Sequence, residues 1–152
     1  MMTVDTVDLS RLTKRLDELA GAMGGNEVAK VLLAGAFVLE GEAKQNVQRM
    51  KAIDTGFMLN SIYSVTASES GYAKARSEAT GRSDDGEMFP EYKPPKAAAA
   101  VCVGAEYGMY VEYGTVRMPA RPFMRQAVET HGGDAVDAIG EAIDRKMQKV
   151  FK

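Results

Sequence analysis

Leucines recur at the spacing of an α-helix near the start of the chain. Leu9, Leu12, Leu16 and Leu19 follow one another at intervals of three and four residues, with charged residues between them. This spacing places the leucines on one face of an amphipathic helix. The pattern therefore predicts a first helix that stops at the glycine-containing stretch of residues 21–25.

A second, longer helix is predicted from Asn26 to about Met50. Asn26 can supply the N-cap side chain, and Glu27 places a negative charge in the first turn, where the helix dipole favours it. Ala and Gly are frequent between residues 34 and 43. Because these small side chains let another backbone come close, we expect this part of the helix to be a packing surface.

The middle of the chain predicts two strands separated by a long polar stretch. One short helical turn at Leu59 and Ile62 leads into a strand around Tyr63–Ala67. Residues 69–96 are rich in Ser, Gly, Asp, Lys and Pro, which predicts a long extended loop or hairpin without regular structure. The run Ala97–Val103 is short, small and β-branched at its end, so we expect a buried strand.

The last third of the chain predicts a short helical segment, a stiff connection and a C-terminal helix. Tyr107, Tyr110 and Tyr113 recur every three residues, which places their rings on one side of a short helix or loop. Two prolines make residues 117–122 an extended connection. The final helix begins at Phe123, is interrupted at residues 132–133 by two glycines, and resumes to the C-terminus.

The order of these elements predicts an α+β fold. Long helices would pack on a small antiparallel sheet, with the extended loop or hairpin of residues 69–96 between the strands and a helix at the C-terminus. A chain of 152 residues without internal repeats is of the size of one domain, so we expect residues 1–152 to fold as a single unit.

Charge and cysteine content narrow the class of protein. The net charge of −2 provides no general positive field for nucleic acid, and Cys102, the only cysteine, excludes an intramolecular disulfide. We expect Cys102 to be a small buried side chain. The sequence shows no secretory signal and no apolar stretch of about 20 residues, so we expect a protein made in the cytosol that does not associate with a membrane.

Two features raise the possibility of catalysis. The triplet Asp54-Thr55-Gly56 is the signature of retroviral-type aspartic proteases, in which two subunits each contribute one carboxylate. That enzyme requires an almost all-β dimer, whereas a long helix precedes the triplet here, and a helix-ending turn is the favoured interpretation. His131 is the sole histidine and lies beside two glycines, which favours a solvated position near a helix end.

Three arginines surround the proline segment and give a further alternative. Arg117, Arg121 and Arg125 could contact phosphate in a DNA-contacting accessory protein. Hydrated or ion-paired surface arginines are the simpler interpretation. The chain has no Gly-x-Ser-x-Gly elbow and no glycine-rich phosphate loop, and we expect no cofactor and no metal.

Two motifs carry a resemblance to a known family. The downstream motif runs Tyr-Gly-Met-Tyr-Val-Glu-Tyr-Gly-Thr over residues 107–115 and continues Met-Pro-Ala-Arg-Pro-Phe-Met-Arg-Gln-Ala over residues 118–127. The upstream motif is Thr-Gly-Phe-Met-Leu-Asn-Ser-Ile at residues 55–62. Together they resemble the phage tail-completion and head-tail joining (neck) proteins, which are tail components of long-tailed siphophages.

The resemblance implies a structural virion protein and no enzyme. Such a subunit would form a ring, a hexamer, at the head-tail junction, assembled in the host cytoplasm. It would contact copies of itself and the neighbouring head-connector and tail-terminator or tail-tube proteins, with genomic DNA only as transiting cargo. The resemblance assigns interface or architectural roles to Thr55, Gly56, Tyr110, Glu112, Tyr113, Gly114, Thr115, Pro119, Arg121, Pro122 and Phe123.

Overall fold

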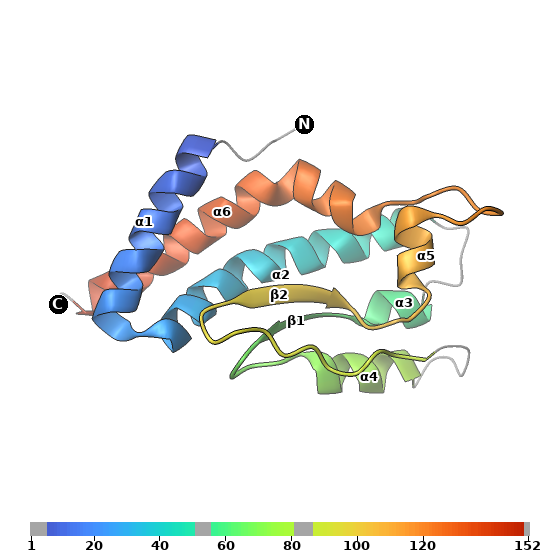
Figure 1. Cartoon of the computed structure of the whole chain (residues 1–152), viewed down its shortest axis with the longest axis horizontal. Coiled ribbons are helices and arrows are strands. Elements are labelled where there is room, and N and C mark those ends of the chain that lie inside the picture. Colours follow the sequence, from blue (N-terminus) through green and yellow to red (C-terminus); the bar gives the residue numbers. More distant parts are fainter. Residues whose placement is uncertain (1–5, 51–55, 81–86, 151–152) are drawn as a thin grey trace.

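The computed structural model of the chain describes residues 6–50, 56–80 and 87–150. The elements, in chain order, are α1 (Thr6–Met23), α2 (Gly25–Met50), α3 (Gly56–Asn60), β1 (Ile62–Thr66), α4 (Tyr72–Thr80), β2 (Ala99–Val103), α5 (Gly108–Tyr113) and α6 (Phe123–Val150). Figure 1 shows α1, α2 and α6 together on one side of the two-stranded β1–β2 sheet, and α4 on the other. The α+β prediction, with long helices on a small antiparallel sheet and a C-terminal helix, is confirmed.

The two N-terminal helices form close to where the sequence places them. Gly24 separates them with a φ of 92°, a conformation that favours glycine, and its N–H donates to the carbonyl of Ala20. Because α2 already begins at Gly25, Asn26 lies inside the helix and does not cap it. Leu12 and Leu19 are buried against α2 and α6, whereas Leu9 is exposed.

The thin face of α2 packs against α6, as expected, but only along part of its length. A Cβ built on Gly35 would lie 2.7 Å from the side chain of Ile139 and 3.1 Å from the carbonyl oxygen of Ala135. Glycine is therefore what allows α6 to approach α2 here. A Cβ on Gly41 would meet nothing within 4 Å, so this glycine takes no part in the packing.

The C-terminal helix is continuous from Phe123 to Val150, so the prediction of an interruption at the two glycines is wrong. Gly132 is buried in the helix, and the neighbouring His131 is 3.5 Å from the carboxylate of Glu42 on α2. Packing against α2 along its length outweighs the cost of about 1 kcal/mol that each glycine adds to a helix. His131 accordingly lies in mid-helix and not near a helix end.

The sheet consists of two antiparallel strands, with Ile62 opposite Val103 and Thr66 opposite Ala99. Every residue of β1 is buried, but every residue of β2, including Cys102, is only half-buried. The prediction of a buried strand is therefore wrong for β2. A two-stranded sheet leaves each strand an edge, and the second edge of β2 is not covered by another strand of the described residues.

The expectation of a structureless excursion is also wrong for the described parts of residues 69–96. They contain α4, whose Ala75 and Ala79 are buried. The return segment is held by two hydrogen bonds, from the Tyr72 hydroxyl to the Phe89 carbonyl and from the Tyr92 N–H to the Tyr63 hydroxyl, at 3.0 and 3.1 Å. The small apolar face of two alanines was too weak a pattern to reveal this helix.

Candidate functional site

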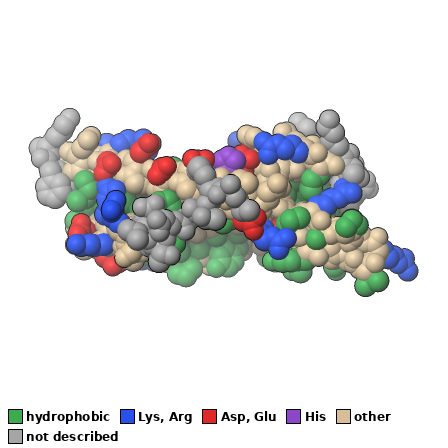
Figure 2. Space-filling view, turned by 90° about the horizontal axis from the view of Figure 1, so that it is seen from above, with side chains coloured by type: hydrophobic (Ala, Val, Ile, Leu, Met, Phe, Trp, Pro, Cys, Tyr) green, Lys and Arg blue, Asp and Glu red, His purple; other side chains and the backbone are tan. Residues whose placement is uncertain are grey.

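The two motifs of the sequence meet in one core, and the downstream motif builds a projecting loop above it. We call residues 114–122, which connect α5 to α6, the motif loop. Figure 1 shows this loop extending beyond the helices at one end of the molecule. In Figure 2 the same end is narrow, with basic side chains at its tip and hydrophobic side chains beside them.

Gly114 makes the sharp turn at the start of the motif loop. Its φ of 79° is unfavourable for other residues, and its N–H donates to the carbonyl of Tyr110 at 2.8 Å. A Cβ at this position would lie 2.7 Å from the backbone nitrogen of Ala120. The structure thus requires glycine both for the backbone conformation and for the close return of the loop.

The motif loop is held by its own hydrogen bonds. Thr115 and Met118 exchange backbone hydrogen bonds of 2.8 and 3.3 Å, which close a tight turn with Val116 fully exposed at its tip. The Arg121 N–H then donates to the carbonyl of Val111 at 2.7 Å and ties the returning chain to α5. Pro119, which is exposed, lies between these hydrogen-bonded positions and fixes its own φ.

Glu112 joins α5 to the start of α6. Its two carboxylate oxygens accept hydrogen bonds from the backbone N–H groups of Met124 and Arg125, both at 2.9 Å. These N–H groups belong to the first turn of α6 and have no partner within the helix. Negative charge is also favoured at this end of a helix dipole, so Glu112 has an architectural role as a cap.

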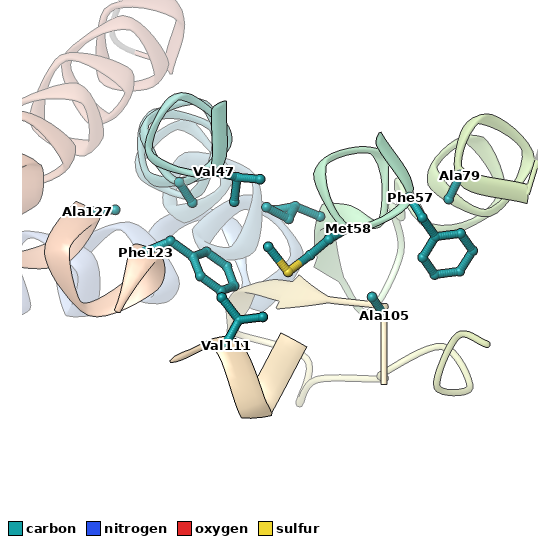
Figure 3. Packing of buried hydrophobic residues seen from close by; sticks show 10 residues of the cluster. Val47, Phe57, Met58, Ala79, Ala105, Val111, Phe123 and Ala127 are labelled. Atoms are coloured by element: carbon teal, nitrogen blue, oxygen red, sulfur yellow. The ribbon is translucent and has the colours of Figure 1, made fainter. Parts of the chain in front are cut away.

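Phe123 anchors the motif loop in the core. Its side chain is buried, and Figure 3 shows it close to Val47, Met58 and Val111. Its carbonyl accepts a hydrogen bond of 3.0 Å from the side-chain amide of Asn46, which is itself buried on α2. Pro122, just before it, is half-buried and precedes the first residue of α6.

The upstream motif packs under the same region. Thr55 and Asp54 lie outside the described residues, and Gly56 is the first residue of α3. Phe57 contacts Tyr107, with ring centroids 6.2 Å apart. The buried Ser61 donates from its hydroxyl to the Met58 carbonyl at 2.7 Å and accepts from the Ala105 N–H at 3.0 Å. The serine of the motif therefore fastens α3 to the segment that follows β2.

The three tyrosines do not share one side, contrary to the prediction. Tyr107 precedes α5 and packs against the core, whereas Tyr110 and Tyr113 are 59 % and 75 % exposed. A spacing of three falls short of the 3.6 residues of a helical turn, so successive rings rotate away from one another. The two exposed rings are large apolar surfaces beside the motif loop.

An apolar groove of about 500 Å³ lies between β2, α5 and the first turns of α6. Several of its side chains are largely exposed, among them Phe89, Met109 and Val128. Phe89 and Val128 were not candidates from the sequence, because no periodicity relates a return segment to the outer face of a helix. The apolar groove is lined by Phe89, Val101, Val103, Ala105, Gly108, Met109, Glu112, Tyr113, Phe123, Met124, Arg125 and Val128.

The described residues offer little for catalysis. They contain no cluster of three or more His, Cys, Asp or Glu side chains that could hold a metal ion. His131 lies 3.5 Å from the carboxylate of Glu42 on α2 and 3.9 Å from that of Asp134 on its own helix, which is a contact that links α6 to α2. The mainly helical fold is not the almost all-β dimer that an Asp-Thr-Gly protease requires. Within the described ranges, no helix is long and apolar enough to cross a membrane.

Comparison with known proteins gives a match to a family model. The family model described as "Bacteriophage HK97-gp10, putative tail-component" matches residues 10–114, which is more than half of the chain. The matched region includes the upstream motif, the apolar faces of α2 and β2, and Gly114, while the rest of the motif loop and α6 lie beyond it. No curated protein and no solved structure matches the chain.

Proposed function

Because the chain belongs to the HK97-gp10-like family of bacteriophage tail components, we propose that it is a structural subunit of the ring that joins head and tail. The observation that carries the proposal is the motif loop, a projection held by its own hydrogen bonds, whose tip residue Val116 is fully exposed. Ring subunits need such projections, because each must contact the next copy with a different surface.

The second surface of a ring contact would be the apolar groove. A heterologous interface closes into a ring when one copy's projection fits a depression on its neighbour. The groove combines exposed apolar side chains with a firm base, since Phe123 and Val103 are packed into the core below it. Exposed apolar patches of this kind mark protein contact sites. The entropy that the motif loop loses on binding should be small, because its internal hydrogen bonds already fix its conformation.

The ring would be a hexamer that also contacts the head-connector and the tail-terminator or tail-tube proteins, in the virion at the head-tail junction after assembly in the host cytoplasm. Genomic DNA would pass only as cargo, consistent with a net charge of −2. The motif residues support an architectural role and not an enzyme: Gly114 turns the chain, Glu112 caps a helix and Phe123 fills the core.

The proposal is tested by Val116→Asp in the phage that encodes the chain, with Val116→Ala as the matched control. Because Val116 is fully exposed, neither change should alter folding, which circular dichroism of the purified chain would verify. We expect Val116→Asp to leave separate filled heads and tails in lysates and to lower infectivity, whereas Val116→Ala should not. Normal joined particles from a folded Val116→Asp chain would contradict a contact at the loop tip.

A further inference from the structure

The hydrogen bonding between β1 and β2 shows which backbone groups of β2 face outward. Gly104 donates to the carbonyl of Ser61 at 2.9 Å, so these two residues bond across the strands, although the Gly104 carbonyl accepts from the Phe89 N–H at 2.8 Å. In an antiparallel pair such residues alternate with non-bonded ones. The register therefore makes Cys102 and Ala100 the residues of β2 that bond to β1. The N–H and C=O groups of Ala99, Val101 and Val103 must point away from β1.

The outer edge of β1 confirms this pattern, because it is already occupied. Thr66 donates to the carbonyl of Glu69 at 2.7 Å, and the carbonyl of Ser64 accepts from Gly71 at 3.0 Å. Thr66 and Ser64 are outward residues of β1, and the chain itself supplies a partner for one backbone group of each. Within residues 6–50, 56–80 and 87–150, no hydrogen bond reaches the corresponding outward groups of β2. Figure 1 shows β2 flanked by a strand on one side only.

The open edge of β2 also lacks the usual protection against pairing. Exposed edge strands commonly carry charges, prolines or bulges that prevent another strand from adding. The run Ala97–Val103 has none of these, and its first four residues are alanines, which leave the backbone accessible. All five residues of β2 are half-buried, so part of each stays accessible to solvent.

We propose that β2 pairs with β2 of a second copy of this chain, antiparallel and centred on Val101, to form a four-stranded sheet. The outward residues 99, 101 and 103 are symmetric about Val101, so the same three residues supply every donor and acceptor on both sides. A two-stranded sheet gains from this addition because its open backbone groups become paired. Val101 and Val103, which line the apolar groove, lie along this seam.

This contact uses the backbone edge of β2, whereas the ring contact proposed above uses the loop tip and the side chains of the apolar groove, Val101 and Val103 among them. A two-fold interface presents the same surface from both copies and closes after two, whereas a ring contact uses two different surfaces. The strand contact therefore links copies in pairs, in solution or between rings, and does not depend on the loop tip. A failure of one proposal leaves the other standing.

A register-specific cross-link tests the pairing. In the proposed register Ala100 lies opposite the partner's Cys102 in a non-hydrogen-bonded pair, where Cα atoms are about 4.5 Å apart and a disulfide can form. Under mild oxidation we expect Ala100→Cys to give a disulfide-linked dimer through the native Cys102. Ala99→Cys is the matched control, because side chain 99 is on the opposite face of the sheet. No dimer from Ala100→Cys, or as much from Ala99→Cys, would overturn the proposal.

A second measurement does not depend on cysteine chemistry. Ala99→Pro removes an outward N–H at the start of β2, a position where an edge strand tolerates proline. Ala99→Val is the control, because valine is similar in size to proline and keeps the backbone N–H. By sedimentation we expect the wild-type chain and Ala99→Val to dimerise, and Ala99→Pro to weaken the dimer about tenfold or more. A monomeric wild-type chain, or an Ala99→Pro dimer of unchanged affinity, would contradict strand pairing.

Discussion

The cap that Glu112 places on α6 leads to the most direct stability prediction. Replacing Glu112 by alanine removes both acceptors and leaves the N–H groups of Met124 and Arg125, now bonded at 2.9 Å, without their partner. Hydrogen bonds to charged groups contribute about 1.5–3 kcal/mol, and loss of a helix N-cap costs about 0.5–2 kcal/mol. Since water can reach the vacated N–H of the exposed Arg125, we expect the free energy of unfolding to fall by about 2 kcal/mol.

Two further variants separate capping from the loss of a charge. Glu112→Gln keeps one side-chain oxygen that can accept from Met124 or Arg125, but it lacks the charge that the helix dipole favours. We expect it to lose about half as much stability as the alanine variant. Glu106→Ala is the control, because Glu106 is an exposed carboxylate close in sequence whose side chain makes no hydrogen bond to the described residues.

Urea denaturation followed by circular dichroism would measure the three variants, with the thermal midpoint as a second readout. A loss of 2 kcal/mol corresponds to a decrease of about 4–8 °C in a domain of this size. The slope with urea should not change, since the folded surface is the same. If Glu112→Ala stayed within about 0.5 kcal/mol of Glu106→Ala, the carboxylate would not be an effective cap and our account of the α5–α6 junction would be wrong.

Four other substitutions test the helix packing, the turn at Gly114 and the titration of one buried tyrosine. Gly35→Ala should lower the free energy of unfolding by about 1–3 kcal/mol in urea, because its Cβ would meet Ile139 at 2.7 Å, whereas Gly41→Ala in the same helix should raise it by about 0.5–1 kcal/mol. Equal effects of the two would contradict the close α2–α6 contact. Gly114→Ala should cost about 1–3 kcal/mol by the same measurement, since its φ is 79°; a neutral result would refute the strained turn. Burial raises the pKa of Tyr63 to about 12, so the unfolded chain releases this proton at lower pH than the folded chain. The stabilising contribution is complete below pH 10 and should decline as the pH rises toward 12. In unfolding titrations Tyr63→Phe should show a shallower decline of stability with pH, and a decline identical to that of the wild-type chain would contradict this prediction.

Patterns with the period of a helix predicted the long helices well. The leucine stripe and the glycines near residue 24 locate the end of α1 and the start of α2 within about two residues, because one buried face and one flexible turn are both local properties. The two glycines of α6 misled the prediction, since their local cost is outweighed by packing against α2 that the sequence does not display.

The sequence singles out the motif residues as a group, but it does not show which contacts each of them makes. Gly114 and Phe123 have the turn and anchor roles that their chemistry suggests. The contact of Glu112 with α6 crosses a loop, and that of Asn46 with the Phe123 carbonyl joins residues 77 apart in the chain. Such partners depend on the tertiary arrangement of α2, α5 and α6, so no local spacing could reveal them.

The open edge of β2 could not be predicted from the sequence either. Ala97–Val103 looks like a buried strand because it is small and apolar, yet burial depends on how many strands the sheet has. A sequence pattern reports the preference of a strand and not the number of its neighbours. Only the register with β1 shows that Ala99, Val101 and Val103 turn backbone groups outward, where the described residues supply no partner.

The most direct test of the account is an electron cryomicroscopy reconstruction of the neck of virions from the phage that encodes this chain. We expect density for the chain in a closed ring between the head connector and the tail, with each motif loop against the apolar groove of the next copy. Infectious virions that lack the chain, or a neck ring built without it, would contradict the proposed structural role.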